Sequence, residues 1–121
     1  MSATVDHIGI NVSDYEKAKA FYAAALAPLG LKPMMDFGVI VGIGGDFPFL
    51  WISAGVPGHV HLAFRCEKRS EVDAFYAAAM KAGATDNGAP GLRTEYSENY
   101  YAAFVHDADG HNIEAVCHNA E

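Results

Sequence analysis

The chain has 121 residues, of which 51% are hydrophobic and 19% charged, and its formal net charge is −7. This length predicts one domain, and the negative charge argues against nucleic acid or an anionic membrane surface as the natural partner. No apolar run is long enough to span a membrane, and the first residues lack a signal-peptide pattern. The two cysteines, Cys66 and Cys117, have no metal-type spacing, so we interpret them as free buried thiols of a cytoplasmic protein.

The second half of the chain repeats the first. A shift of 54 positions carries His7 onto His61 and the segment AFYAAA at 20–25 onto the same letters at 74–79. A fixed internal period predicts two copies of one supersecondary unit. Units this small bury little surface alone, so we expect them to share a core within one domain, 1–121. The first module is expected at 1–55 and the second at 59–121.

The first half predicts one strand, one helix and three further strands. Residues 3–12 alternate between apolar and polar, with the period of a strand. The sequence SDYE at 13–16 has the form of a capping box and predicts a helix start. Apolar residues at three- and four-residue spacing continue the helix until Pro28 and Gly30 end it. Short apolar runs broken by glycine over 31–54 indicate three strands of a meander.

The second half predicts the same order. Residues 59–66 form a strand, and Ser70 and Asp73 cap a helix. This cap lies closer to the repeated AFYAAA than the first one does, so we expect the second helix to begin a turn later. Each half therefore predicts β-α-β-β-β. The remaining elements are a short strand around Ala84, a loop rich in glycine and proline at 87–91, strands at 100–105 and 112–117, and a turn at 107–110.

Three motifs sit at the ends of these units. DHIG at 6–9 opens the first strand, HLAF at 61–64 opens the second unit, and DADGHNIE at 107–114 closes it. With the duplicated βαβββ unit, they resemble the vicinal oxygen chelate superfamily, which includes glyoxalase I, extradiol dioxygenases, fosfomycin-modifying enzymes and bleomycin-resistance binding proteins. The resemblance implies an α+β fold in which two βαβββ modules form a curved mixed sheet around a cleft. Fold alone does not choose among these functions.

The resemblance also implies a metal site. In that superfamily each module can supply ligands from its first and last strands, which here gives His7, His61 and Glu114. The fourth position falls on or near Trp51, and an indole N–H only donates hydrogen bonds, so it cannot hold a metal. Two imidazoles and one carboxylate suit one divalent ion (Zn, Mn, Fe or Ni) and leave positions open for water or a bidentate oxygen ligand.

Two functions fit this site. The first is a metal-dependent enzyme of the glyoxalase or dioxygenase type, in which the ion polarises vicinal oxygens of a small-molecule substrate in lyase, isomerase or dioxygenase chemistry. The second is a metal-free small-molecule binding protein of the bleomycin-resistance type. The absence of a first-module carboxylate weakens the glyoxalase pattern. No acid–base histidine can be assigned; the candidates by residue type are His106, His111 and His118, and His59 shares a strand face with His61.

Several other side chains are expected to contact the ligand. Arg65 shares a strand face with His61 by alternation, and an arginine there could bind an anionic substrate through two hydrogen bonds. We also expect a homodimer, because curved half-open sheets leave edges and apolar faces that a second copy can cover. Whether the cleft forms within one chain or by exchange between chains stays open. The candidate substrate-binding residues are Phe49, Trp51, Arg65, Arg93, Tyr100 and Phe104.

Overall fold

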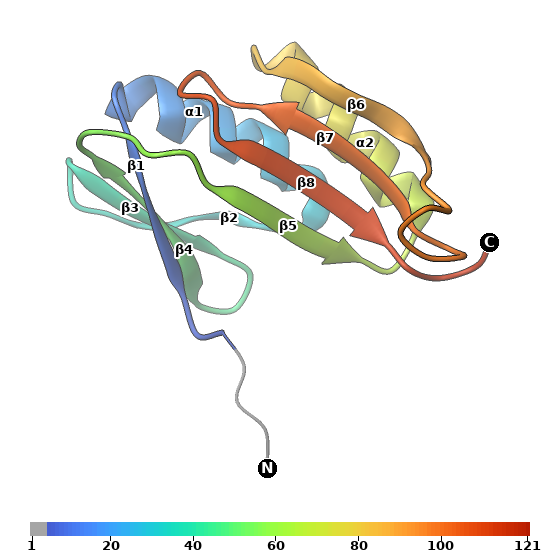
Figure 1. Ribbon diagram of the computed structural model, residues 1–121. Coiled ribbons are helices and arrows are strands. Elements are labelled where there is room, and N and C mark those ends of the chain that lie inside the picture. The colour runs from blue at the N-terminus through green and yellow to red at the C-terminus, as the bar shows by residue number, and fades with distance from the viewer. Residues whose placement is uncertain (1–4) are drawn as a thin grey trace.

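The structure is a computed structural model that describes residues 5–121 (Figure 1). It confirms the α+β fold and the predicted order of elements in both halves. The first module contains β1 (Ile8–Val12), α1 (Tyr15–Leu26), the 3-10 turn η1 (Ala27–Leu29), β2 (Lys32–Asp36), β3 (Ile40–Gly44) and β4 (Pro48–Ala54). The second contains β5 (His61–Cys66), α2 (Arg69–Lys81), β6 (Thr85–Leu92), β7 (Tyr101–His106) and β8 (Asn112–Cys117).

Each module forms its own four-stranded sheet. The strand orders are β1-β4-β3-β2 and β5-β8-β7-β6, so both modules share one topology. In each, the first strand pairs in parallel with the last, and the other pairs are antiparallel. This arrangement leaves β1 and β5 as edge strands of their sheets.

One face of each sheet is covered by that module's helix, and the two helices pack against each other (Figure 1). The buried face of α1 carries Tyr22 and Leu26, and that of α2 carries Phe75, all fully buried. The hydrophobic core cluster contains residues of both modules. On the edge strand β5, the residues of the other face, His61, Ala63 and Arg65, are exposed. The helices therefore leave this second face open.

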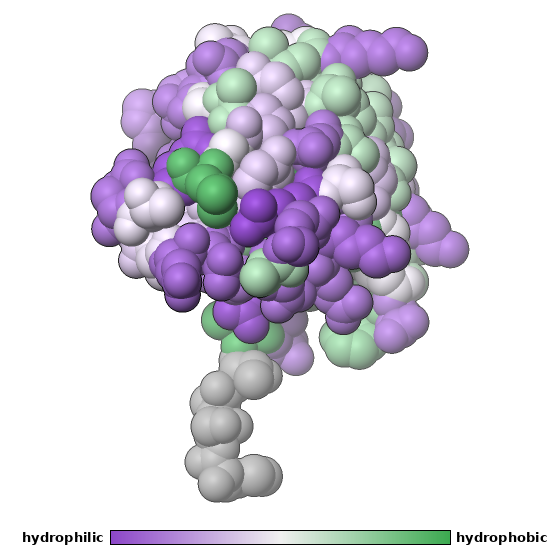
Figure 2. All heavy atoms as spheres, turned by 90° about the vertical axis from the view of Figure 1, so that its right-hand side faces the viewer, coloured by the Kyte–Doolittle hydropathy of each residue, from purple (hydrophilic) through white to green (hydrophobic). Residues whose placement is uncertain are grey.

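The polar and apolar surfaces are unevenly distributed. Figure 2 shows the end of the molecule where the C-terminus lies, and hydrophilic side chains cover most of it. Large exposed apolar side chains gather instead on β2 and the turn into β3, where Met34, Met35, Phe37 and Val39 are found. Neither helix described for residues 5–121 is long and apolar enough to cross a membrane. Both cysteines are buried and free, as predicted.

The first strands of the two modules are shorter than predicted. Pairing between β1 and β4 begins at Ile8, and pairing between β5 and β8 begins at His61. Residues 5–7 precede β1 without strand structure, and residues 3 and 4 of the expected strand lie outside the described part. A strand ends where its neighbour no longer offers hydrogen-bond partners, and alternation in one strand does not report this.

The predicted cap of the first helix was wrong by one residue. Asp14 is the N-cap and accepts the N–H of Lys17 at 3.2 Å. The hydroxyl of Ser13 instead donates to Oδ1 of Asp109, in the other module, at 2.6 Å. A long-range partner therefore displaced the local capping bond that the sequence favoured.

The second helix does not begin a turn late. It starts at Arg69, the position equivalent to Tyr15 under the 54-residue shift. Lys68 is the N-cap, and its N–H donates to the carboxylate of Glu71 at 3.0 Å, so Ser70 lies within the helix and is not the predicted cap.

The expected loop at 87–91 is part of β6. Its pairing with β7 shifts register twice, around Gly88 and before Gly91, so several backbone groups lack a regular ladder partner. The guanidinium of Arg93 supplies donors that this irregular strand needs. It donates from Nη1 to the carbonyls of Gly91 at 2.8 Å and Ala102 at 2.5 Å, and from Nη2 to that of Ala89 at 2.9 Å.

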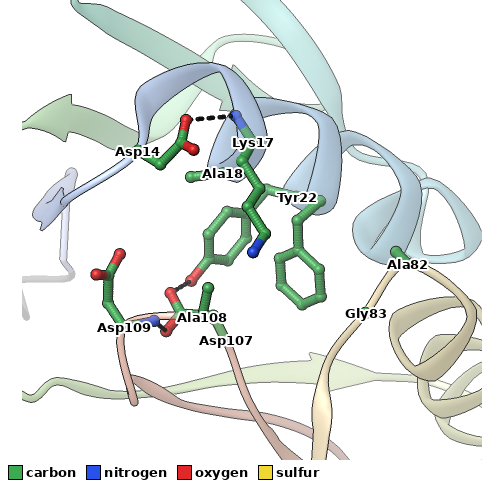
Figure 3. Close-up of a pocket in the computed structure, with 10 residues that line it drawn as sticks. Asp14, Lys17, Ala18, Tyr22, Ala82, Gly83, Asp107, Ala108 and Asp109 are labelled. Atoms are coloured by element: carbon green, nitrogen blue, oxygen red, sulfur yellow. Dashed lines mark hydrogen bonds between the residues drawn. The ribbon is translucent and has the colours of Figure 1, made fainter.

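Polar side chains join the two modules beside a small cavity (Figure 3). The hydroxyl of Tyr22 donates to Oδ2 of Asp107 at 2.6 Å. Burial and the nearby Asp107 raise the pKa of Tyr22, so its hydroxyl remains a donor. The cavity, which Asp14 and Asp109 also line, holds about 30 Å³. That is room for about one water molecule, and we therefore regard this region as a structural joint.

Candidate functional site

The second module brings His61 and Glu114 together. The parallel register of β5 and β8 sets Glu114 opposite Ala63, two residues from His61 on the same face. Nε2 of His61 lies 2.8 Å from Oε1 of Glu114. The carboxylate side chain is only 1% exposed. A buried carboxylate is costly unless it is hydrogen-bonded or paired with a cation, which marks this pair as a functional candidate.

Tyr100 is hydrogen-bonded to the other oxygen of the Glu114 carboxylate. Its hydroxyl donates to Oε2 of Glu114. Burial, and then the hydrogen bond to Glu114, raise the pKa of Tyr100 to about 12. The hydroxyl therefore stays protonated and able to donate near neutral pH. The rings of Tyr96 and His118 meet that of Tyr100 edge-on, with centroids 5.0 and 5.2 Å away, and hold it in place.

These side chains line one open pocket of about 310 Å³. The ring of Phe104 lies 6.2 Å from that of His61, centroid to centroid, and forms part of the wall. The structure thus brings together four residues singled out from the sequence and adds Tyr96. The sequence signal for Tyr96 was its position in the tyrosine-rich segment 96–101. The lining residues are His61, Tyr96, Tyr100, Phe104 and Glu114.

The first module forms a separate pocket. His7 lies directly before β1, its Nδ1 is 2.7 Å from Oδ2 of Asp6, and its side chain is 60% exposed. Trp51, on β4, is half-buried. The volume of this open pocket is about 500 Å³. It is lined by His7, Gly9, Phe37, Ile40, Trp51 and Ser53.

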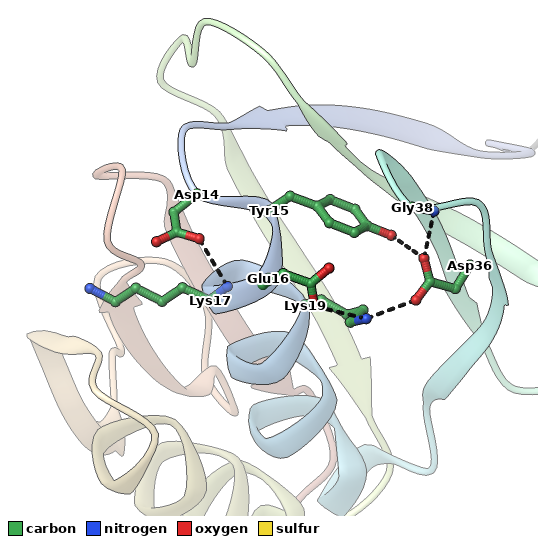
Figure 4. A network of polar contacts seen from close by, with 7 residues as sticks. All are labelled: Asp14, Tyr15, Glu16, Lys17, Lys19, Asp36 and Gly38. Atoms are coloured by element: carbon green, nitrogen blue, oxygen red, sulfur yellow. Dashed lines mark hydrogen bonds and ion pairs between the residues drawn. The ribbon is translucent and has the colours of Figure 1, made fainter.

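A polar network fixes the turn that carries Phe37 into this pocket (Figure 4). Asp36 accepts hydrogen bonds from the hydroxyl of Tyr15 at 2.5 Å, from Nζ of Lys19 at 2.8 Å and from the N–H of Gly38 at 3.0 Å. The bond from Lys19, followed by those from Tyr15 and Gly38, lowers the pKa of Asp36. The ionised carboxylate therefore ties the end of β2 to α1.

Three of the candidate substrate residues lie outside the linings of both pockets. The ring of Phe49 packs against Phe64 of the second module, 6.2 Å between centroids, and joins the core. Arg93 is held by backbone carbonyls, as described above, so we do not carry it into the site. Arg65 is exposed on the same face of β5 as His61, four residues further along the strand.

His111 is not free for acid–base work. It is fully buried, its Nε2 donates to the carbonyl of Asn11 at 2.8 Å, and its Nδ1 accepts the N–H of Val60 at 3.1 Å. Only the neutral ring protonated at Nε2 makes both bonds. The histidine therefore belongs to the joint between the modules.

The three expected metal ligands are not assembled within one chain. Among residues 5–121, no group of three or more His, Cys, Asp or Glu side chains is placed to hold a metal ion. His7 belongs to one pocket, and His61 and Glu114 belong to the other. The donor set still suits a divalent cation, because a buried carboxylate beside an imidazole leaves a negative charge to be balanced. A metal ion held by this pair would need a further ligand from elsewhere.

Comparison with known proteins places the chain in a family. The model of the Glyoxalase/Bleomycin resistance protein/Dioxygenase superfamily matches residues 4–115. Among solved structures, a glyoxalase/bleomycin resistance protein from Albidiferax ferrireducens is similar, with 28% identity, a TM-score of 0.81, and coverage of 92% of this chain and 96% of that one. No curated protein sequence matches the chain.

Two more distant structures share the fold. A lactoylglutathione lyase from Agrobacterium tumefaciens is 16% identical, with a TM-score of 0.72 over 96% of this chain and 94% of that one. A genomically encoded fosfomycin resistance protein from Listeria monocytogenes is 18% identical, with a TM-score of 0.74 over 97% and 94%. The duplicated topology and the match over nearly the whole length lead to one conclusion. The chain belongs to the glyoxalase/bleomycin resistance protein/dioxygenase superfamily.

Proposed function

We propose that this protein is a divalent-metal-dependent enzyme acting on a small molecule with vicinal oxygens. The observation that carries the proposal is the buried carboxylate of Glu114, which meets His61 on one oxygen and Tyr100 on the other. Such a carboxylate is poised to hold a cation, and Tyr100 would orient it as a hydrogen-bonded neighbour of a metal ligand. Residence in the cytoplasm is proposed with it, on the strength of the two free thiols.

We propose further that His7 reaches this metal from a second copy of the chain. Within one chain the two half-sites lie on different sheets and line different pockets. The open faces, the edge strands β1 and β5, and the exposed apolar side chains around Phe37 all favour a homodimer. A two-fold dimer would build the same site twice.

The residues divide the work in a defined way. A bound divalent ion supplies Lewis-acid polarisation of the substrate's vicinal oxygens. Glu114 and the two imidazoles would hold it, and Tyr100 would fix the orientation of the carboxylate. Two fold relatives are a lactoylglutathione lyase and a fosfomycin resistance protein, so lyase, isomerase and dioxygenase chemistry are the classes to be tested. Trp51 at the position expected for a fourth ligand leaves the first module without a carboxylate.

A metal-free binding protein is the second candidate. The observation that favours it is the first-module pocket, whose lining is mainly apolar and includes Trp51 and Phe37. A ligand could be held there by apolar contact without any chemistry. The two candidates differ in whether a metal is retained.

Metal binding separates the two functions. The protein is stripped with a chelator, incubated with Zn, Mn, Fe or Ni, desalted and subjected to elemental analysis. We expect about one ion per chain in the wild type and less than about a tenth of that in His61→Ala, because a ligand is removed. His59→Ala removes an exposed histidine just before β5. This variant should retain as much metal as the wild type. If the wild type retains none of these ions, the binding-protein function takes its place.

Mixed dimers test the exchange between copies. His7→Ala and His61→Ala are co-expressed with different tags, and the doubly tagged species is isolated. If each site takes His7 from one copy and His61 from the other, one of the two sites in the mixed dimer keeps every ligand. We then expect about half of the wild-type metal content, whereas each variant alone binds almost none. A mixed dimer that binds none would place all ligands of a site in one chain.

A further inference from the structure

Trp51 lies between two glycines on the open face of the first sheet. The register pairs it with Gly9 on β1 and with Gly42 on β3. Residues paired across neighbouring strands point to the same face, so no side chain flanks the indole on either strand. Of these three paired residues, only Trp51 carries a side chain, and it is the largest in the pocket.

The indole lies down over Gly42. A Cβ at that position would come within 2.8 Å of both Cζ3 and Cη2 of the indole and within 2.8 Å of Cβ of Pro48. Real side chains do not approach so closely, so only glycine lets the ring rest on β3. The Trp51 ring is thereby fixed along the sheet and covers β3.

The opposite side of the tryptophan is empty. A Cβ on Gly9 would meet only the carbonyl oxygen of Trp51, at 3.9 Å. The backbone of β1 at Gly9 therefore forms the floor of the pocket. Phe37, which is 66% exposed, forms part of the wall of the same pocket. The pocket volume of about 500 Å³ is in the range of small-molecule sites. Among the residues that the structure describes, its polar lining side chains are His7 and Ser53, and no carboxylate, amine or guanidinium group lines it.

We propose that this pocket binds the planar aromatic part of the ligand, lying on the floor at Gly9 against the indole of Trp51. The bare backbone at Gly9 lets a flat ring approach the strand closely over its whole face, and the side chains of Trp51 and Phe37 supply apolar contact for it. The lining favours an uncharged ring that carries oxygen substituents toward His7 and Ser53. This proposal specifies the class of substrate. It rests on the proposed function only in that a metal ion is bound at His7.

The pocket contains its own reporter, because Trp51 is the only tryptophan of the chain. Intrinsic fluorescence is titrated with 1-naphthol and with its saturated analogue decahydro-1-naphthol, in the presence of a chelator. We expect saturable quenching by 1-naphthol and at least about tenfold weaker binding of the saturated analogue, measured by competition. Equal binding of the two would overturn the inference.

Variants of the floor and the ring locate the binding. Gly9→Val fills the floor with a residue suited to a strand, and we expect it to weaken 1-naphthol binding by about tenfold or more while the wild-type unfolding midpoint is kept. Trp51→Leu, followed by equilibrium dialysis, should weaken binding similarly. Phe47→Ala, an exposed phenylalanine outside the pocket, is the control and should bind as the wild type. Unchanged binding in both Gly9→Val and Trp51→Leu contradicts the proposal.

The 1-naphthol experiment and the metal experiment test the two proposals separately. Wild-type protein that retains metal but shows no saturable quenching by 1-naphthol overturns this inference alone. Protein that binds 1-naphthol but retains no metal overturns the metalloenzyme alone.

Discussion

At the scale of single residues, the site depends on how one carboxylate is satisfied. Glu114 is buried in β8, and its two oxygens have different partners, an imidazole and a phenol. The phenol keeps its proton because burial and the carboxylate together raise its pKa to about 12. Tyr100 is thus a permanent donor, which leaves the His61 side of the carboxylate to face the pocket.

Removing the hydroxyl group of Tyr100 should therefore lower both the free energy of unfolding and the affinity for metal. Tyr100→Phe leaves Oε2 of Glu114 without its donor, and we expect a loss of about 1–3 kcal/mol in the free energy of unfolding. Metal affinity should fall about 10- to 100-fold, as is usual when a neighbour of a ligand is lost. Urea denaturation and metal titration measure the two effects. Tyr96→Phe, at a tyrosine that is 63% exposed, is the matched control, and an equal loss there would contradict the assignment.

A pair of glycines gives opposite predictions for one substitution. Gly42→Ala puts a Cβ 2.8 Å from the indole of Trp51 and from Pro48, so we expect a loss of about 1–3 kcal/mol in unfolding free energy. Gly9→Ala meets only one atom, at 3.9 Å, and should be neutral or stabilising, because alanine restricts the unfolded chain. Thermal denaturation of both variants checks this, and equal effects would show that the indole does not rest on β3.

At the scale of elements, the β2–β3 turn is held by charge rather than by burial. Met35, Phe37 and Val39 are exposed, so little apolar burial anchors this part of the first module. The carboxylate of Asp36 instead gathers bonds from α1 and from the turn itself (Figure 4). A wall of the first-module pocket therefore depends on an ion pair at the surface.

This anchor should depend on pH in a defined direction. The pKa of Asp36 is lower when folded than its ordinary value of 3.8, so its contribution is complete above pH 3.8 and is lost as the pH falls below it. Asp36→Asn should thus lower the urea midpoint at pH 7, with the difference from the wild type shrinking below pH 3.8. It should also speed hydrogen exchange of the Gly38 amide. Asp46→Asn, at an exposed turn, should do neither; a gap that persists unchanged at low pH would argue against the ion pair.

At the scale of the whole molecule, the helices decide where the half-sites lie. They pack against each other and against one face of each sheet. His7 and the His61–Glu114 pair consequently open into different pockets. A monomer of this shape exposes two incomplete sites, which is the physical argument for a second copy.

Sedimentation tests this argument. We expect a homodimer at micromolar concentration, because the open sheet faces and the exposed apolar turn at Phe37 favour association. Phe37→Asp, which puts a charge on this turn, should shift the equilibrium toward monomer while circular dichroism stays unchanged. A wild type that sediments only as a monomer would contradict both the dimer and the exchange of His7 between copies.

Part of the fold and site could be predicted because its signals are local. Alternation around His61 and the three- and four-residue spacing in AFYAAA each report which face of one element is buried, whatever the element packs against. The family resemblance then pointed to His61 and Glu114, and the structure brings these two together. Distant partners caused the misses. Ser13 bonds Asp109 rather than its own helix, and pairing with β7 makes the expected loop at 87–91 part of a strand.

The sequence by itself determined two repeated modules and their order of elements, since periodicity is a property of short segments. Only the tertiary structure decided which of the candidate site residues meet. It paired Glu114 with Tyr100, withdrew Phe49 and Arg93 into packing, and separated His7 from His61. The reason is physical: the relative placement of two sheets follows from how α1 and α2 pack, and helix packing depends on the summed fit of many side chains rather than on any local pattern.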